Sequence, residues 1–220
     1  IVNNAKITIS DGSLDVSSNY DINYIAGNIT VLRRPINIYT LDKEKLYDGT
    51  ELINHEYFID KGEGLYDLLP GHTLDIINNT SITNVVYDYL GNVCGISNEI
   101  ETIKVMNGLM PVTNNYEIFY TPGILTINPR IFVVETFDYT KEFDGVSFFE
   151  LDEQLFIIHQ SDGFATGEYV SNILYGNYDV CVGIHPMDII FTIINSKRVD
   201  VTNNYKFEIT YGDLEITGEE

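Results

Sequence analysis

The sequence predicts an all-β protein built from tandem sandwich-type units, and three observations carry this prediction. Apolar and polar residues alternate along short runs, as in the stretch where Tyr116, Ile118 and Tyr120 share one face. Turn residues separate these runs roughly every ten positions, and a sustained helical period is almost absent. The same phrases also recur along the chain. We therefore expect Ig-like or sandwich-type repeat units in an elongated arrangement; the alternative is β-grasp-like units with one short helix.

The clearest recurrence is an Asn-Tyr pair followed by a glycine, and it occurs three times. The copies are Asn19-Tyr20 with Gly27, Asn115-Tyr116 with Gly123, and Asn204-Tyr205 with Gly212. Val16 returns as Val112, so the first two copies are 96 positions apart (112 minus 16). Because internal self-similarity at a fixed period is typical of repeat architectures, we interpret the chain as an array.

This recurrence predicts the domain organisation. Residues 1–34 align without a gap with residues 97–130 and read as the C-terminal half, or closing hairpin, of an upstream repeat. Residues 35–130 form a complete β repeat. Residues 131–220 form a second complete but diverged repeat, which lacks about nine residues after its middle.

Each repeat is expected to close with a hairpin. Pro122-Gly123 is typical of a type II turn, in which glycine supplies a positive φ. The alternating run that follows, Leu125-Thr126-Ile127, is expected to return antiparallel to the strand before the turn. The last strand then enters the next repeat through a proline with no Gly/Ser linker, which predicts a short, semi-rigid junction.

A second recurring phrase lies near the start of each complete repeat. Tyr47-Asp48-Gly49 returns as Phe143-Asp144-Gly145. Asp-Gly is a tight-turn dipeptide, and we expect the aromatic residue before it to plug the end of the core.

Together these phrases resemble the MBG/YDG-type tandem repeats of large bacterial surface proteins. The resemblance rests on residues 45–50 (Lys-Leu-Tyr-Asp-Gly-Thr), residues 69–74 (Leu-Pro-Gly-His-Thr-Leu) and residues 112–127, and it covers essentially the whole chain. It implies a β-rich module in the extracellular part of an adhesin-like or cell-wall-attached protein, with no catalytic residues. The second copy departs from the pattern at Phe143 and at residues 167–170 (Gly-Glu-Tyr-Val), which speaks against a binding surface common to both copies.

Charge excludes some classes of partner. The chain carries 12 basic and 33 acidic residues, for a net charge of -21. Nucleic acids and anionic membrane surfaces are bound by lysine and arginine, so neither is an expected partner. No run approaches the roughly 18 apolar residues of a membrane-spanning helix, so we expect no membrane insertion within this segment.

The candidate chemistry is sparse. No nucleophile elbow, phosphate loop or Cys/His pairing is present, so we expect no enzyme activity and no cofactor. Calcium is the alternative, because acidic residues gather before and within the Asp-Gly turns: Asp42, Glu44 and Asp48 in the first copy, and Asp138, Glu142 and Asp144 in the second. Neither set follows the EF-hand pattern, and Asp48 and Asp144 are better explained as turn formers. The four histidines, His55, His72, His159 and His185, lack the spacing of metal ligands. The cysteines Cys94 and Cys181 occupy equivalent positions in successive copies, too far apart for a disulfide, so we expect both to be free and buried.

Two functions follow as hypotheses. The first is a structural stalk or spacer of a bacterial cell-surface protein, which projects an adhesive or other distal domain from the cell wall and whose partners are neighbouring repeats of the same chain. The alternative is a ligand-binding adhesin module that recognises a host glycan or protein. Both place the segment outside the cell.

Overall fold

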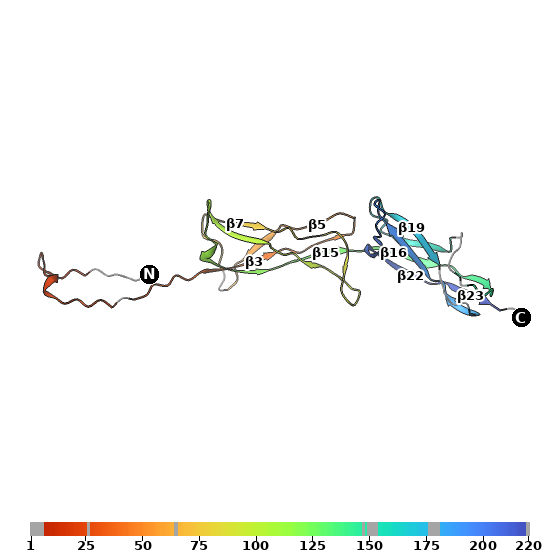
Figure 1. Cartoon of the computed structure of the whole chain (residues 1–220), viewed down its shortest axis with the longest axis horizontal. Coiled ribbons are helices and arrows are strands. Elements are labelled where there is room, and N and C mark those ends of the chain that lie inside the picture. The colour runs from red at the N-terminus through yellow and green to blue at the C-terminus, as the bar shows by residue number, and fades with distance from the viewer. Residues whose placement is uncertain are drawn as a thin grey trace.

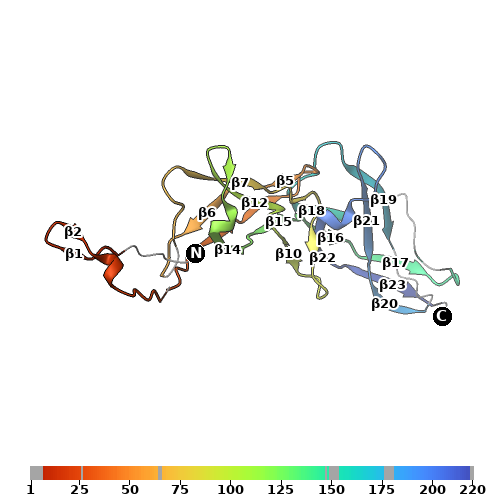
Figure 2. The same cartoon turned by 60° about the vertical axis from the view of Figure 1, so that its left-hand side comes forward.

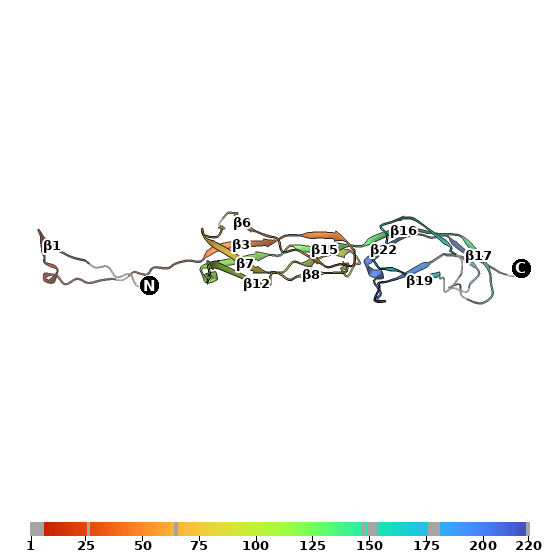
Figure 3. The ribbon, with the colours of Figure 1, turned by 90° about the horizontal axis from the view of Figure 1, so that it is seen from above.

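The computed structural model describes residues 7–25, 27–63, 66–146, 148, 154–175 and 181–218. The chain is elongated: an extended N-terminal segment leads into two groups of strands that follow one another along the long axis (Figures 1 and 3). We call residues 34–128 the first strand group and residues 130–217 the second strand group. Across the described part of the chain the only helices are three 3-10 turns of three residues each, so the all-β prediction is confirmed and the short helix of the β-grasp alternative is not found there. No helix in those ranges is long and apolar enough to cross a membrane.

The first strand group contains thirteen of the strands. Its elements are β3 (Arg34–Thr40), β4 (Lys43–Leu46), β5 (Leu52–Ile53), β6 (Tyr57–Asp60), β7 (His72–Ile77), β8 (Ser81–Ile82), β9 (Val86–Tyr87), β10 (Val93–Cys94), β11 (Ile96–Ser97), β12 (Thr102–Asn107), β13 (Met110–Pro111), η2 (Thr113–Asn115), β14 (Tyr116–Thr121) and β15 (Ile124–Asn128). They form three-stranded sheets in the orders β14-β3-β6, β11-β15-β4 and β13-β12-β7, with β5-β8 and β10-β9 as smaller pairs.

The second strand group has counterparts of the main pairings. Its elements are β16 (Arg130–Thr136), β17 (Tyr139–Glu142), β18 (Phe156–Ser161), β19 (Tyr169–Tyr175), β20 (Gly183–Pro186), β21 (Ile189–Ile194), η3 (Thr202–Asn204), β22 (Tyr205–Thr210) and β23 (Asp213–Thr217). The sheets run β18-β16-β22, β17-β23-β20 and β19-β21. In both groups the opening strand pairs parallel with a closing strand: Tyr116 lies opposite Arg34, and Tyr205 lies opposite Arg130.

The predicted closing hairpins are wrong. Strands β14 and β15 do not pair with each other; β14 runs parallel to β3 in one sheet, and β15 runs parallel to β4 in another. Strands β22 and β23 repeat this arrangement against β16 and β17. The closing segment therefore keeps its direction and changes sheet at the glycine, where the opening segment also passes from one sheet to the next.

The glycine at this point has a different role from the predicted one. Gly123 and Gly212 have no positive φ, so neither supplies a type II turn. A Cβ atom on Gly123 would lie 2.6 Å from the Thr40 carbonyl oxygen, and one on Gly212 would lie 2.6 Å from the Thr136 carbonyl oxygen. Glycine is required because two backbones cross without room for a side chain.

A buried threonine fixes each crossing. The Thr40 hydroxyl donates to the Asn98 carbonyl at 2.8 Å and accepts from the Gly123 amide at 2.9 Å. Thr136 makes the same pair of contacts with the Met187 carbonyl at 2.9 Å and the Gly212 amide at 3.0 Å. Each crossing is thus closed by one satisfied side chain in the core.

The N-terminal segment packs far less than either strand group. It contains β1 (Ser10–Asp11), β2 (Leu14–Asp15) and η1 (Ser17–Asn19), and none of its described residues up to residue 33 is buried. Tyr20 is 57% exposed, whereas its counterparts Tyr116 and Tyr205 are buried. No atom lies within 4 Å of a Cβ built on Gly27. The described residues between 20 and 33 belong to no strand, and the assignment of residues 1–34 to an upstream repeat stays a prediction.

The main hydrophobic core is continuous across the two groups. Tyr47, Leu125 and Ile127 of the first group belong to one buried cluster with Phe132 and Tyr205 of the second. A separate, smaller cluster around Ile36, Ile38, Val105 and Tyr116 lies at the other end of the first group. The joint between the groups is therefore part of the core.

Candidate functional site

The joint begins where β15 passes into β16 through Pro129, and the backbone there is held from both sides (Figure 2). The Tyr47 amide donates to the Asn128 carbonyl at 2.8 Å. The Arg130 Nε donates to the Tyr47 carbonyl at 2.7 Å, and its Nη1 donates to the carbonyls of Asp162 and Gly163. One guanidinium thus ties a turn of the first group to a loop of the second.

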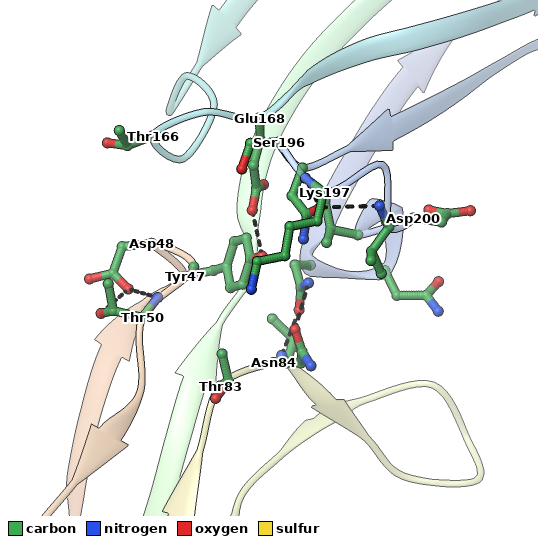
Figure 4. A pocket seen from close by; sticks show the side chains of 17 residues that line it. Tyr47, Asp48, Thr50, Thr83, Asn84, Thr166, Glu168, Ser196, Lys197 and Asp200 are labelled. Atoms are coloured by element: carbon green, nitrogen blue, oxygen red, sulfur yellow. Dashed lines mark hydrogen bonds between the residues drawn. The ribbon is translucent and has the colours of Figure 1, made fainter.

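A carboxylate between two tyrosines forms the centre of the joint (Figure 4). The Tyr47 hydroxyl donates to Glu168 Oε1 at 2.8 Å, and the Tyr205 hydroxyl donates to Glu168 Oε2 at 2.6 Å. The two rings meet edge to face, with centroids 5.8 Å apart. Burial, and then Glu168, raise the pKa of both phenols far above the usual value.

The asparagine of the third Asn-Tyr pair also bridges the groups. Asn204 Oδ1 accepts from the Val85 amide at 2.8 Å, and Asn204 Nδ2 donates to Asn84 Oδ1 at 3.1 Å. Asn204 is buried, whereas Asn115 and Asn19 at the corresponding positions are exposed. The asparagine of the recurring Asn-Tyr pair is therefore buried only in the copy that contacts the other strand group.

The turn that enters the joint is built by its own sequence. Gly49 has a φ of 78°, and Asp48 Oδ1 accepts from the Thr50 amide at 2.8 Å and from Lys45 Nζ at 2.6 Å. The hydrogen bonds from Lys45 and Thr50 lower the pKa of Asp48 to about 2. Tyr47 is 2% exposed, so the predicted plug is present here.

The corresponding turn of the second group is closed in the same way but is not buried. Gly145 has a φ of 75°, and Asp144 Oδ1 accepts from Lys141 Nζ at 2.6 Å and from the Val146 amide at 2.9 Å. Phe143, however, is 48% exposed, so the expectation that it plugs a core is wrong.

A cavity of about 780 Å³ opens at the joint, next to Tyr47. Most of its lining residues are polar, and they include Asp48, Glu168 and Asp200 together with the single lysine Lys197 (Figure 4). No histidine or cysteine lines it, and the residues present can offer hydrogen bonds to a ligand. Within the described ranges, no three His, Cys, Asp or Glu side chains converge as they do around a metal ion.

Two acidic residues that the calcium alternative drew on have structural roles. Asp42 Oδ1 accepts from the Ile124 amide at 2.7 Å, and Asp138 Oδ1 accepts from the Asp213 amide at 2.8 Å. Both carboxylates cap the strand that follows the close-packed glycine. Cys94 and Cys181 form no disulfide, as expected, but Cys94 is only half-buried and Cys181 is exposed, so the expected burial is wrong for both.

The structure therefore divides the predicted motif residues between different places. Tyr47, Asp48, Asn204 and Tyr205 meet at the joint, whereas Tyr116 lies at the far end of the first group. There the Tyr116 hydroxyl lies 2.6 Å from His72 Nδ1 and accepts from the Leu69 amide at 3.1 Å. Three of the others lie in the N-terminal segment, outside both groups: Asn19, Tyr20 and Gly27.

Sequence reasoning missed Glu168 and Arg130 as joint residues. The signal for Glu168 was its place in the recurring phrase, where it occupies the position of His72. A change from an imidazole to a carboxylate at a recurring position indicates that the two positions have different neighbours.

Searches of protein-family models, curated proteins and solved structures find no match to this chain.

Proposed function

We propose that this chain is a stiff spacer of a bacterial cell-surface protein, built from tandem sandwich-type units of the Ig-like kind, that projects an adhesive or other distal domain from the cell wall. Its partners are the neighbouring units of the same chain, and it carries out no catalysis and needs no cofactor. Because spacing requires only length and resistance to bending, the quality of the joint decides how well the chain performs it.

The observation that carries the proposal is the joint itself. Glu168 of the second group accepts a hydrogen bond from a tyrosine hydroxyl of each strand group. Arg130 donates to the Tyr47 carbonyl, and Asn204 accepts from the amide of Val85, next to the β9–β10 hairpin. These contacts surround a core cluster shared by both groups. A flexible pair of domains is connected by a linker with few crossing contacts, and this joint has the opposite character.

The cell-surface location rests on the resemblance to MBG/YDG-type repeats and on the chain's acidity. A net charge of -21 keeps extended surface segments soluble and apart from one another. The MBG/YDG-like phrases at residues 45–50, 69–74 and 112–127 support a location outside the cell.

Residual dipolar couplings, supported by small-angle scattering, test the spacer function. We expect the couplings of both strand groups to fit one alignment tensor, and scattering to give a rod of fixed length. Glu168→Ala should separate the tensors, because two hydroxyls at the joint lose their acceptor. The control is Glu117→Ala, which removes an exposed glutamate of β14 away from the joint. Two independent tensors in the unmodified chain would refute the proposal.

A second function, a ligand-binding module for a host glycan or protein, is favoured by the cavity at the joint. Its volume of about 780 Å³ lies within the range of small-molecule pockets, and its lining offers amide and carboxylate groups suited to sugar hydroxyls. A glycan array should then give a hit that Lys197→Ala weakens and that Lys104→Ala, a change on β12 in the first group, does not. A blank array would leave the cavity as the crevice between two docked units.

A further inference from the structure

The two strand groups present the same end face, and only one of these faces is covered. In the second group the face contains Glu168, Tyr205, Asn204 and Ala165, and the turn of residues 45–50 lies against it. We call this the Glu168 face. The corresponding positions in the first group are His72, Tyr116, Asn115 and Leu69, which we call the His72 face.

The two faces have the same internal hydrogen bonds around their tyrosine. Ala165 donates its amide to the Tyr205 hydroxyl at 2.9 Å, and Leu69 donates its amide to the Tyr116 hydroxyl at 3.1 Å. The side chain three positions later, Glu168 or His72, contacts the same hydroxyl at 2.6 Å. Each face is thus a tyrosine fixed between a backbone amide and a polar side chain.

Exposure separates the faces. Ala165 is 3% exposed and Leu69 is 43% exposed, and Asn204 is buried whereas Asn115 is not. In the second group, Tyr47 of the first group packs against Tyr205, and Asn84 of the first group accepts from Asn204. On the His72 face Tyr116 is already buried, and the exposed positions are Leu69 and Asn115.

The opposite end of the molecule carries the matching cover. The turn of residues 141–146 has the same Lys–Asp bond and the same left-handed glycine as the turn of residues 45–50. It presents Phe143 to solvent, whereas Tyr47 is buried against the Glu168 face. The two strand groups thus present a partly exposed face at one end and an exposed turn at the other.

The hydrogen-bonding groups of each face can be compared with the aromatic residue that would dock on it, Tyr47 on the Glu168 face and Phe143 on the His72 face. Glu168 has two carboxylate oxygens, and each accepts one hydroxyl, from Tyr47 and from Tyr205. At the His72 face, ring nitrogen Nδ1 contacts the Tyr116 hydroxyl, and His72 offers no carboxylate oxygen to an incoming tyrosine. A phenylalanine brings no hydroxyl and leaves no buried donor unpaired.

We propose that the His72 face is a docking site for the aromatic-Asp-Gly turn of another strand unit of this same kind, and that the turn of residues 141–146 docks into such a face through Phe143. This inference rests on the proposed spacer function, because it extends the observed joint into a general rule for end-to-end stacking. Glu168 takes Tyr47 in the observed joint, and the His72 face, which has no carboxylate at this position, is matched to the turn that carries a phenylalanine.

A two-copy chain creates the predicted junction for a test. Residue 217 of one copy is joined directly to residue 33 of the next, because Thr217 corresponds to Asn128 and Arg33 to Pro129 at the observed joint. The chain has no tryptophan, so Phe143→Trp in the first copy gives a single reporter. We expect acrylamide to quench this tryptophan severalfold less in the two-copy chain than in the single chain. Val146→Trp, on the same turn but outside the aromatic position, should be quenched equally in both.

Equal quenching of the Phe143→Trp reporter in both chains would overturn the proposal unless the indole is too large for the face. Phe143→Ala decides that case, because it only removes atoms. It should lower the melting temperature of the two-copy chain more than that of the single chain, and an equal change in both would overturn the inference. The single chain's dipolar couplings report on the observed joint alone, so failure here is distinguishable from failure of the spacer function.

Discussion

The turns of residues 45–50 and 141–146 have nearly the same local conformation and opposite surroundings. Both carry a left-handed glycine, with φ of 78° at Gly49 and 75° at Gly145, and both bond an aspartate to a lysine at 2.6 Å. Yet Tyr47 is buried between two strand groups, whereas Phe143 faces solvent.

This difference shows that the turn's own residues determine its conformation, whereas its contribution to stability depends on a neighbouring strand group. Asp and Gly set the backbone of either turn without help from a neighbour. The aromatic residue stabilises the fold only where another strand group supplies the opposing surface. The two turns are therefore matched probes of the joint.

The largest expected effect comes from truncating the aromatic residue of each turn. Tyr47→Ala removes a buried ring from the shared core and should lower the free energy of unfolding by about 3–5 kcal/mol. Phe143→Ala removes a half-exposed ring and should cost less than about 1 kcal/mol. Urea denaturation followed by circular dichroism measures both. Similar losses in the two variants would break the comparison, because they would show that the joint adds nothing.

The next effect contrasts a glycine at a backbone crossing with one in open surroundings. Gly123→Ala places a methyl group 2.6 Å from the Thr40 carbonyl oxygen and should destabilise the first strand group by about 2–3 kcal/mol. Gly27→Ala meets no atom within 4 Å and should change the melting temperature little. Should both changes be tolerated equally, the crossing would be looser than its geometry indicates.

These glycines also show how far the sequence could carry the prediction. The alternation in residues 116–120 predicted a half-buried strand, and β14 has this burial pattern. The position of the glycine was recognised, but its reason was not, because a turn and a backbone crossing both require glycine. Only the parallel pairing of β14 with β3 distinguishes them, and such long-range pairing leaves no local signal.

The candidate site was predictable only in part for the same reason. Tyr47 and Asp48 belong to a recurring phrase, so they could be recognised as structural residues. Glu168 could not, because its function depends on the hydroxyl of Tyr47, which is 121 positions away in the chain. A substitution within a recurring phrase indicates that a position has changed partners, but it does not name the new partner.

A smaller effect comes from exchanging the hydroxyl between the two turns. Tyr47→Phe removes one hydrogen bond to Glu168 and should cost about 1.5 kcal/mol, the low end for a bond to a charged acceptor. Phe143→Tyr adds a hydroxyl at an exposed ring and should leave the urea midpoint unchanged. The role assigned to Glu168 would be wrong if Tyr47→Phe were equally silent.

The smallest effect is a change in how stability depends on alkaline pH. Burial and then Glu168 raise the pKa of Tyr47 in the folded chain, whereas in the unfolded chain tyrosine ionises near its usual value of about 10. The stabilisation is therefore complete below about pH 10 and is lost as the pH rises further, because the unfolded chain releases the proton first. Tyr47→Phe should reduce this loss by up to about 1.4 kcal/mol per pH unit, one proton's worth. Tyr205, with the same cause for its raised pKa, should contribute a second proton to the slope, and Phe143→Tyr should add none. Urea midpoints measured between pH 9 and 11 give the change of stability with pH for the unmodified chain, for Tyr47→Phe and for Phe143→Tyr. An unchanged slope in Tyr47→Phe would mean that its hydroxyl is open to solvent and that the joint is not closed in solution.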